Sequence, residues 1–372
     1  LLLTGCFARA AAEKHSIIRL WKQSSRLISR SITQNAGDHG EHYITRDKKE
    51  YWAMFYSAAG GGVLIALMAL FKTYLGSIID DKVWKGLAEG LNYGFGFMVI
   101  FMLHFTVATK QPAMTAARFA EAVEKNPQGK TLNMKLAQLL VDVFRSQSVA
   151  VLGNVVVAMG LAALIAFVYQ HQTGEPLMNS EKIAYQLHRI DPLDGSLWFA
   201  AIAGVWLFCS GIISGYFDNR SNYLNMRMRL AQHPLLKKLM SEKSRVKFAN
   251  YMHENYGSLI GNFCFGMLLG LTGLVGYLTH LPLDIRHVAF SSANLGYSAV
   301  SGQFAYPFFL QCIAFVLLIG LVNLMVSFSL TLWVALRSLN TEIDSWWAIW
   351  HEVCQIVRKR PLSLFLPVQL DK

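Results

Sequence analysis

Residues 146–174 read SQSVAVLGNVVVAMGLAALIAFVYQHQTG, a run of 29 residues without Asp, Glu, Lys or Arg. A helix that rises about 1.5 Å per residue needs roughly 20 apolar residues to cross a bilayer core of about 30 Å. Five further runs of at least 20 residues lack formal charge in the same way: Tyr51–Phe71, Gly90–Thr109, Gly195–Phe217, Asn255–Leu283 and His287–Leu336. The chain is therefore predicted to be an all-α polytopic membrane protein.

The composition of the 372 residues supports this class. Hydrophobic residues make up 53% of the chain, charged residues make up 15%, and the mean hydropathy is +0.34. An ordinary soluble domain has about 25% charged residues. The low charge content excludes a soluble domain of average composition.

The net charge of +11 is distributed unevenly along the chain. Of 34 Lys and Arg residues, 28 lie in residues 1–50, 110–145, 220–247 and 337–372. The alternate loops hold only five: Lys82, Lys85, Lys182, Arg189 and Arg286. Cytoplasmic loops of membrane proteins carry an excess of Lys and Arg, so this bias predicts a bacterial inner-membrane protein with both termini in the cytoplasm. The charge thus indicates topology and contact with anionic lipid headgroups on the cytoplasmic side, rather than a nucleic-acid surface.

About six helices are expected to span the bilayer. They cover Trp52–Ile79, Leu87–Thr109, Ser148–Tyr169, Ser196–Phe217, Gly257–Thr279 and Phe308–Leu336, with Lys72 snorkelling toward the outer end of the first. The chain divides into a basic juxtamembrane helical segment (residues 1–51), a six-span membrane domain (52–336) and an amphipathic cytoplasmic tail (337–372). Basic cytoplasmic helices connect spans two and three and spans four and five.

The 50-residue run His287–Leu336 is too long for one span, and Pro307 divides it. Its first part is rich in Ser, Gly and Asn. A complete crossing there would place the C-terminus outside, against the basic residues 358–360. We therefore expect a re-entrant or interfacial segment, which requires protein or water to satisfy its backbone.

Polar residues at membrane depth are costly and often functional, so they supply the candidate sites. The richest cluster lies at the expected outer mouth and comprises Asp284, Arg286, His287, Ser291, Ser292 and Asn294. In one interpretation Asp284 and Arg286 pair and His287 titrates near neutral pH at a functional site. In the other the pair anchors an interfacial turn.

Two further groups have both a functional and a structural interpretation. Lys110, Gln111, Asp218, Asn219 and Arg220 lie at the inner ends of spans two and four, where they either bind an anion or act as snorkelling charges and helix stops. The polar residues inside spans either line a substrate path or form interhelical hydrogen bonds. These are Asn92, His104, Asn154, Asn262 and Asn323.

No motif indicates a metal, a cofactor or a catalytic residue. The five cysteines have no paired spacing, and no nucleotide loop, zinc motif or nucleophile elbow appears at useful spacing. The prediction is accordingly no cofactor and no metal.

Several strings resemble the bacterial integral membrane family catalogued as "site-specific recombinase". They are GEHYITR (40–46), ATKQPAMTA (108–116), GYFDNR (215–220), PLDIRHVAFSSAN (282–294) and VSFSL (326–330). The resemblance covers nearly the whole chain. It implies a protein that is longer at the N-terminus, which fits a chain that begins without Met and suggests an upstream domain as a partner.

The family label implies DNA strand exchange, but the residues do not carry its chemistry. A tyrosine recombinase needs a His-x-x-Arg box, and none of the 11 histidines is followed three residues later by Arg. Three functions therefore stand open: a transporter, channel or lipid-handling protein working through the polar face of residues 284–294, a non-catalytic scaffold or sensor, and the recombinase of the label.

Overall fold

The computed structural model describes residues 44–45, 47–107, 115–116, 119–123, 130–339 and 343–366. These residues form helices and turns, and no strand occurs among them. The all-helical prediction is confirmed for this part of the chain. The long helices are α3 (Lys48–Ile78), α4 (Lys82–Met102), α6 (Lys130–Thr173), α8 (Ser196–Tyr223), α11 (Glu242–Thr279) and α13 (Tyr306–Leu339). The shorter helices are α7 (Ser180–Ile190), η3 (Pro192–Asp194), α9 (Met226–Gln232), α10 (Pro234–Leu239), α12 (Val288–Ser301), α14 (Trp346–Lys359) and η4 (Pro361–Leu364).

Five of the described helices are long and apolar enough to cross a membrane, namely α3, α6, α8, α11 and α13. We expected six. The helix that differs is α4, which we placed in a span over Leu87–Thr109. It begins with Lys82, Lys85 and Glu89 on its first turns and ends at Met102.

The chain leaves the helical path after α4 because groups on α3 and α6 satisfy its backbone. His104, expected within the helix of span two, instead adopts a left-handed φ of 58° in an exposed turn after α4. The amide of Thr106 donates to the Ser57 carbonyl at 3.1 Å, and the Asn154 amide donates to the Thr106 carbonyl at 2.9 Å. Irregular backbone is tolerated within an apolar bundle only where the protein supplies such partners.

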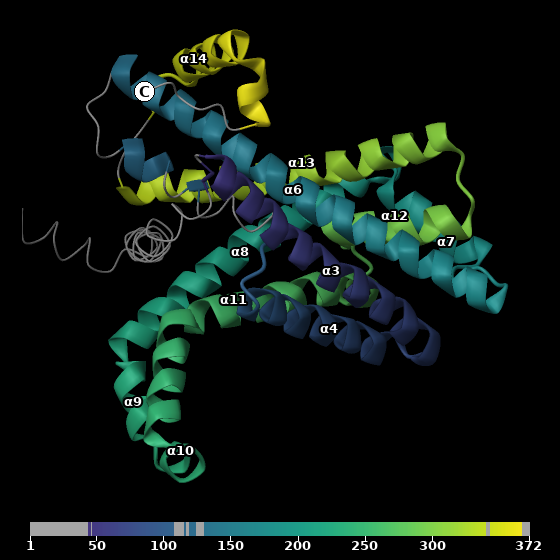
Figure 1. Cartoon of the computed structure of the whole chain (residues 1–372), viewed down its shortest axis with the longest axis horizontal. Helices are drawn as coiled ribbons and strands as arrows, with labels where there is room; N and C mark the ends of the chain where they lie inside the picture. The colour runs from purple at the N-terminus through teal and green to yellow at the C-terminus, as the bar shows by residue number, and fades with distance from the viewer. Residues whose placement is uncertain are drawn as a thin grey trace, which may run out of the picture.

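The helices form two groups that diverge on one side of the molecule (Figure 1). Helix α3 packs along α6, whereas α4 and α8 both pack along α11. We call the side with α7 and the turn between α3 and α4 the α7 end. The opposite side, with α14 in one group and α9 and α10 in the other, is the α14 end. The described residues of three basic segments, 130–145, 220–247 and 337–360, lie at the α14 end.

Glycines set the close contact between α4 and α11. A Cβ on Gly266 would lie 2.2 Å from the backbone of Tyr93, and a Cβ on Gly270 would lie 2.3 Å from the backbone of Gly90. Only glycine allows two helix backbones to approach this closely. The contact holds the charged start of α4 against the end of α11.

The segment expected to be re-entrant enters the bundle and returns to the same end. After Thr279 the chain runs without helix to His287, whose ring lies 5.9 Å from the ring of Phe265. Phe265 precedes the end of α11 by 14 residues, or about 21 Å of helix. Helix α12 then leads back to Ser301, whose hydroxyl accepts a hydrogen bond from the Met178 amide, just before α7.

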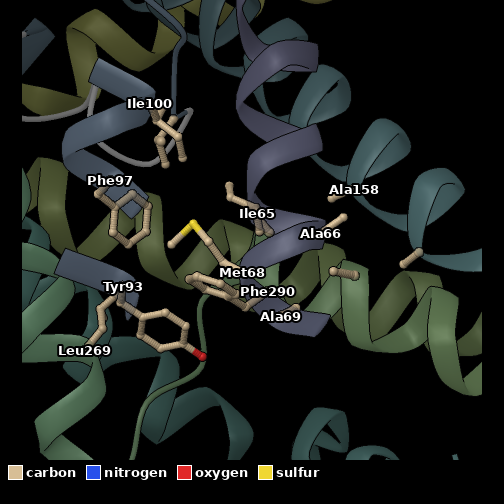
Figure 2. Close-up of a cluster of buried hydrophobic side chains, with 14 of the residues drawn as sticks. Ile65, Ala66, Met68, Ala69, Tyr93, Phe97, Ile100, Ala158, Leu269 and Phe290 are labelled. Atoms are coloured by element: carbon tan, nitrogen blue, oxygen red, sulfur yellow. The ribbon is translucent and has the colours of Figure 1, made fainter. Parts of the chain in front are cut away.

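The core lies where α3, α4, α11 and α12 meet (Figure 2). Ile65, Phe97, Phe290 and their neighbours are buried there, and the Tyr93 and Phe290 rings are 4.3 Å apart. With 14 residues, α12 is about 21 Å long, which is too short to cross about 30 Å of hydrocarbon. Its burial on most sides replaces the contact with lipid that a spanning helix would have.

Candidate functional site

A cavity of about 520 Å³ opens at the α7 end, between α3, α4, α7 and α11. Each helix presents one face to it: Lys182, Tyr185, Gln186 and Arg189 of α7 follow the i, i+3, i+4, i+7 spacing of a helix face. Lys82, Lys85, Gly86 and Glu89 of α4 follow the same spacing. Asp284 and Asn294 also line the cavity, as does Lys72 of α3.

The charge of this basic cavity is its distinguishing property. Its lining includes Lys72, Lys82, Lys85, Lys182 and Arg189 but only two carboxylates, Glu89 and Asp284. The excess is three positive charges. Five of the six cations that sequence analysis placed away from the basic loops thus line one cavity, and the sixth, Arg286, binds Asp284 in its wall.

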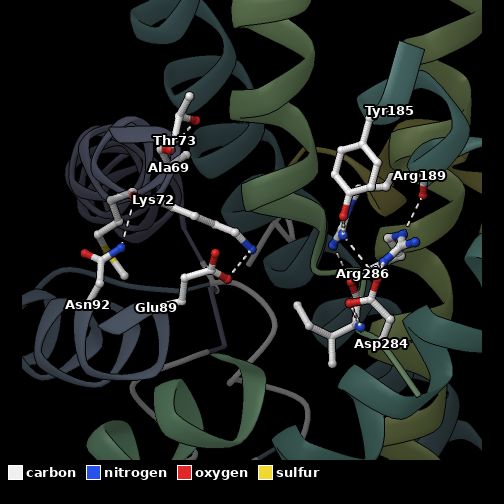
Figure 3. A network of polar contacts seen from close by, with 11 residues as sticks. Ala69, Lys72, Thr73, Glu89, Asn92, Tyr185, Arg189, Asp284 and Arg286 are labelled. Carbon is white, nitrogen blue, oxygen red and sulfur yellow. Dashed lines mark hydrogen bonds and ion pairs between the residues drawn. The ribbon is translucent and has the colours of Figure 1, made fainter. Parts of the chain in front are cut away.

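One wall is an ion-pair network centred on Asp284 (Figure 3). Its carboxylate accepts hydrogen bonds from Arg286 Nη1 at 2.6 Å and from Arg189 Nη1 at 3.1 Å. Arg286 Nε donates to the Arg189 carbonyl at 2.7 Å, and Arg189 Nη1 donates to the Tyr185 hydroxyl at 2.6 Å. The expected ion pair between Asp284 and Arg286 is confirmed, and Arg189 is an additional partner.

Electrostatics keep this network ionised. Burial alone would raise the pKa of Asp284, but the guanidinium groups of Arg189 and Arg286 outweigh it and lower the pKa below its usual value. For Arg189, burial opposes the charged form, yet Asp284 and the Tyr185 hydroxyl raise the pKa on balance. The wall therefore holds a fixed arrangement of two cations and one anion at neutral pH.

The opposite wall pairs Lys72 with Glu89 at 3.0 Å (Figure 3). The Lys72 ammonium also lies 5.4 Å from the centre of the Tyr93 ring. The Lys72 ammonium is thus bound by Glu89 of α4, and its side chain is 30% exposed to the cavity. This pair joins α3 to the start of α4.

Three lysines at the rim are not neutralised by this network. Lys82 stacks on Tyr277 with its ammonium 4.0 Å from the ring centre. Lys85 Nζ lies close to Gly76, 3.1 Å from the position of a Cβ there. Within the described ranges, neither these two lysines nor Lys182 is within ion-pair distance of a carboxylate. They are the cations most available to a bound anion.

The structure divides the predicted polar cluster between the cavity and the interior. Asp284 and Asn294 line the cavity, whereas Ser291 and Ser292 are buried behind it. His287 is 1% exposed and surrounded by the rings of Phe97, Phe265 and Phe290. The expectation that His287 titrates at an outer mouth is wrong, because the chain carries it into the aromatic core.

The predicted inner-end cluster does not assemble within the described residues. Asp218 Oδ1 accepts a hydrogen bond from the Gly257 amide at 2.9 Å, which joins α8 to α11. Asn219 and Arg220 are exposed. Lys110 and Gln111 lie outside the residues that the structure describes. Asp218 thus makes a packing contact between these two helices.

The four asparagines expected at membrane depth bind separate backbone groups. Asn92 donates to the Met68 carbonyl, Asn154 to the Ala58 and Thr106 carbonyls, and Asn262 to the Ser258 carbonyl of its own helix. Asn323 donates to the Ala200 and Arg286 carbonyls and accepts from the Val288 amide, the first of α12. The contacts of Asn92, Asn154 and Asn323 follow the interpretation as interhelical hydrogen bonds, whereas the Asn262 contact lies within α11.

Sequence reasoning did not assign Lys82, Lys85, Lys182, Tyr185 or Glu89 to a site. A signal was present, because these lysines are cations in loops where the charge bias predicts few. What could not be read was their convergence, since they come from α4 and α7, about 100 residues apart in the chain.

Comparison with known families supplies one match. The family model described as site-specific recombinase matches residues 1–367. No curated protein and no solved structure matches the chain. The chain therefore belongs to the site-specific recombinase family, as the resemblance in its sequence indicated.

Proposed function

We propose that this member of the site-specific recombinase family is a membrane protein that binds an anionic, phosphate- or carboxylate-bearing molecule in the basic cavity. Such binding is the ligand step of a transport or lipid-handling function. One observation supports this proposal: five of the six Lys and Arg residues outside the basic segments line one cavity, together with only two carboxylates. Lysine and arginine are the usual ligands of phosphate and carboxylate groups.

The walls and the rim have different parts in this proposal. Asp284 and Glu89 hold Arg189 and Lys72 in place, so these cations are pre-oriented by their partners. Lys82, Lys85 and Lys182 are at the rim and exchange water for the ligand. Orientation before binding reduces the entropy lost when the ligand binds.

A sensor or scaffold that binds the same anion without moving it is the second candidate. It is favoured by the asparagines, whose contacts to separate backbone groups support packing rather than a polar path. Strand exchange is the activity that the family name implies. For that activity the phosphate backbone of DNA would have to reach the basic cavity at the α7 end, away from the basic segments, so we do not propose strand exchange.

The test is anion binding by the purified full chain in phosphatidylcholine nanodiscs. The probes are inorganic phosphate in solution and phosphatidylglycerol added to the disc, which separate a soluble anion from a lipid headgroup. Lys82→Gln and Lys182→Gln should each weaken binding of the effective probe about tenfold, since a hydrogen bond to a charged group contributes roughly 1.5–3 kcal/mol. Lys237→Gln on α10, which also removes one exposed lysine, is the matched control and should leave binding unchanged.

Binding of neither probe, or equal losses in the cavity and control variants, would overturn the proposal. Uptake of the bound probe by proteoliposomes then separates the two candidates. A transporter should move the probe across the bilayer, whereas a sensor should bind it without movement.

A further inference from the structure

A second cavity, of about 490 Å³, lies between α6 and α13, away from the basic cavity. Its lining is almost entirely apolar, with Leu152 and Val155 on α6 facing Leu321 and Met325 on α13. We call it the Gln147 groove, after the one amide in its lining. Leu152 and Leu321 are 49% and 48% exposed, so the groove is open to the surroundings of the helices.

Gln147 is the anomaly in this groove. The residue is 6% exposed, and neither its amide nitrogen nor its carbonyl oxygen has a hydrogen-bond partner within the described ranges. The two preceding residues do have partners, although Arg145 Nε has none among the described residues. Ser146 accepts a hydrogen bond from the Thr45 amide at 2.8 Å, and Arg145 Nη2 donates to the Thr45 carbonyl at 2.5 Å. A buried amide without a partner is costly, so its retention at this position needs an explanation.

Another apolar groove of the same molecule gives an internal comparison. It has a volume of about 610 Å³, lies between α3 and α4, and also contains one amide, that of Asn92. There the amide donates to the Met68 carbonyl at 3.0 Å. The chain thus supplies a partner for the amide in one groove and leaves the amide in the other groove to something outside the described chain.

The position of Gln147 along α6 indicates what that partner is. Arg145 is the last formally charged residue before the 29-residue apolar run, so Gln147 lies at the boundary between the charged and apolar parts of the helix. This is the level of the interfacial region, between headgroups and hydrocarbon. A lipid has its ester carbonyls at this level and its acyl chains just beyond.

We propose that the Gln147 groove is a binding site for a lipid acyl chain whose ester carbonyl accepts a hydrogen bond from the Gln147 amide. The apolar walls of α6 and α13 bury the chain, and the amide recognises the linkage. The site selects for the acyl linkage and not for headgroup charge. Lipid binding in the Gln147 groove does not depend on the anion binding proposed for the basic cavity.

The experiment uses two phosphatidylcholines with the same chains and headgroup, one ester-linked and one ether-linked. The ether form lacks the carbonyl acceptor. Lipid retained by the purified full chain after delipidation and addition of each probe is counted by native mass spectrometry. The wild type should retain the ester form about three- to tenfold better, the ratio expected for a single hydrogen bond. Gln147→Leu should retain both forms equally.

Filling the groove tests its location. Leu152→Trp and Leu321→Trp come from opposite walls, and each should abolish retention of both lipids. Leu67→Trp in the groove between α3 and α4 is the matched control, because Leu67 is 45% exposed and lines a groove whose amide is already bonded. It should leave retention unchanged.

Equal retention of ester and ether lipids by the wild type would overturn the role of Gln147. Retention that survives both tryptophan variants would show ordinary boundary lipid and overturn the site. Phosphate binding in the basic cavity should be unchanged in all three groove variants, so failure of this inference is distinguishable from failure of the proposed function.

Discussion

Replacement of Asp284 by Ala should destabilise the protein more than replacement of Asp284 and Arg286 together. The Asp284 carboxylate is 2.6 Å from Arg286 Nη1 and 3.1 Å from Arg189 Nη1. The Arg286 side chain is 7% exposed and that of Arg189 is 14% exposed. Asp284→Ala therefore leaves two buried guanidinium groups next to each other without a counter-charge.

The magnitude follows from burial. Breaking a buried ion pair by removing one partner costs about 3–5 kcal/mol, whereas an exposed pair contributes about 0–1 kcal/mol. The Asp284 side chain is 29% exposed, which places it between these limits. We expect Asp284→Ala to cost about 2–3 kcal/mol of unfolding free energy. The double change with Arg286→Ala should cost about 1 kcal/mol less, because one of the two stranded guanidinium groups is gone and only Arg189 remains without a counter-charge.

The assay is a double-mutant cycle on the purified protein, read as thermal stability and folded yield. The control cycle uses Arg227→Ala and Glu254→Ala, a pair 3.3 Å apart whose side chains are 48% and 62% exposed. That pair should give a near-zero interaction energy. Additive losses at Asp284 and Arg286, or an interaction energy no larger than that of the exposed pair, would refute the reasoning.

The pH dependence has a definite sign. The pKa of Asp284 is lowered in the folded protein, so its ionised form stabilises the fold at neutral pH. This contribution is present above the unfolded pKa of about 3.9 and is lost as the pH falls through the lower folded value. The stability difference between wild type and Asp284→Asn should accordingly narrow below about pH 4 and stay constant from pH 5 to 8.

Three further predictions concern packing and topology. Asn323→Leu removes three hydrogen bonds to buried backbone groups and should cost at least about 2 kcal/mol in thermal unfolding, since each unsatisfied buried group costs roughly 1–3 kcal/mol. Gly270→Ala should sharply lower the folded yield, because the added Cβ would lie 2.3 Å from the backbone of α4. The control is Gly160→Ala, whose added Cβ would have no heavy atom within 4 Å and which should leave the yield unchanged in the same expression assay. An exported reporter enzyme should be active when fused at Gly174 and inactive when fused at Lys372; activity at Lys372 would contradict the topology read from the basic loops.

The helical class could be read from the sequence because apolar runs and the absence of charge are local properties. The interruption of the last apolar run was also predictable, because its Ser- and Gly-rich first part forms the separate short helix α12 and not part of a spanning helix. The position at which α4 ends could not be predicted from the sequence. The run Gly90–Thr109 has the composition of a span, and it stops at Met102 because Ser57 and Asn154, on other helices, satisfy the turn that follows.

The candidate site was only partly predictable for a similar reason. Asp284 and Arg286 are two residues apart, so their ion pair is a short-range property of the sequence. Arg189 reaches the same carboxylate from 95 residues away, and Lys72 pairs with Glu89 on the neighbouring helix. The burial of His287 depends on rings from α4 and α11, which no local pattern indicates.

The exceptions to the charge bias carry more information about the site than the bias itself. The topology predicted from the 28 basic residues of the other segments requires no particular arrangement of those residues in space. The six remaining cations (Lys72, Lys82, Lys85, Lys182, Arg189 and Arg286) are not needed for this predicted topology. Chance retention of such residues would scatter them over the α7 end, yet five line one cavity and the sixth binds a carboxylate in its wall. Like charges repel one another when confined together, so this convergence supports the proposal that an anion binds among them.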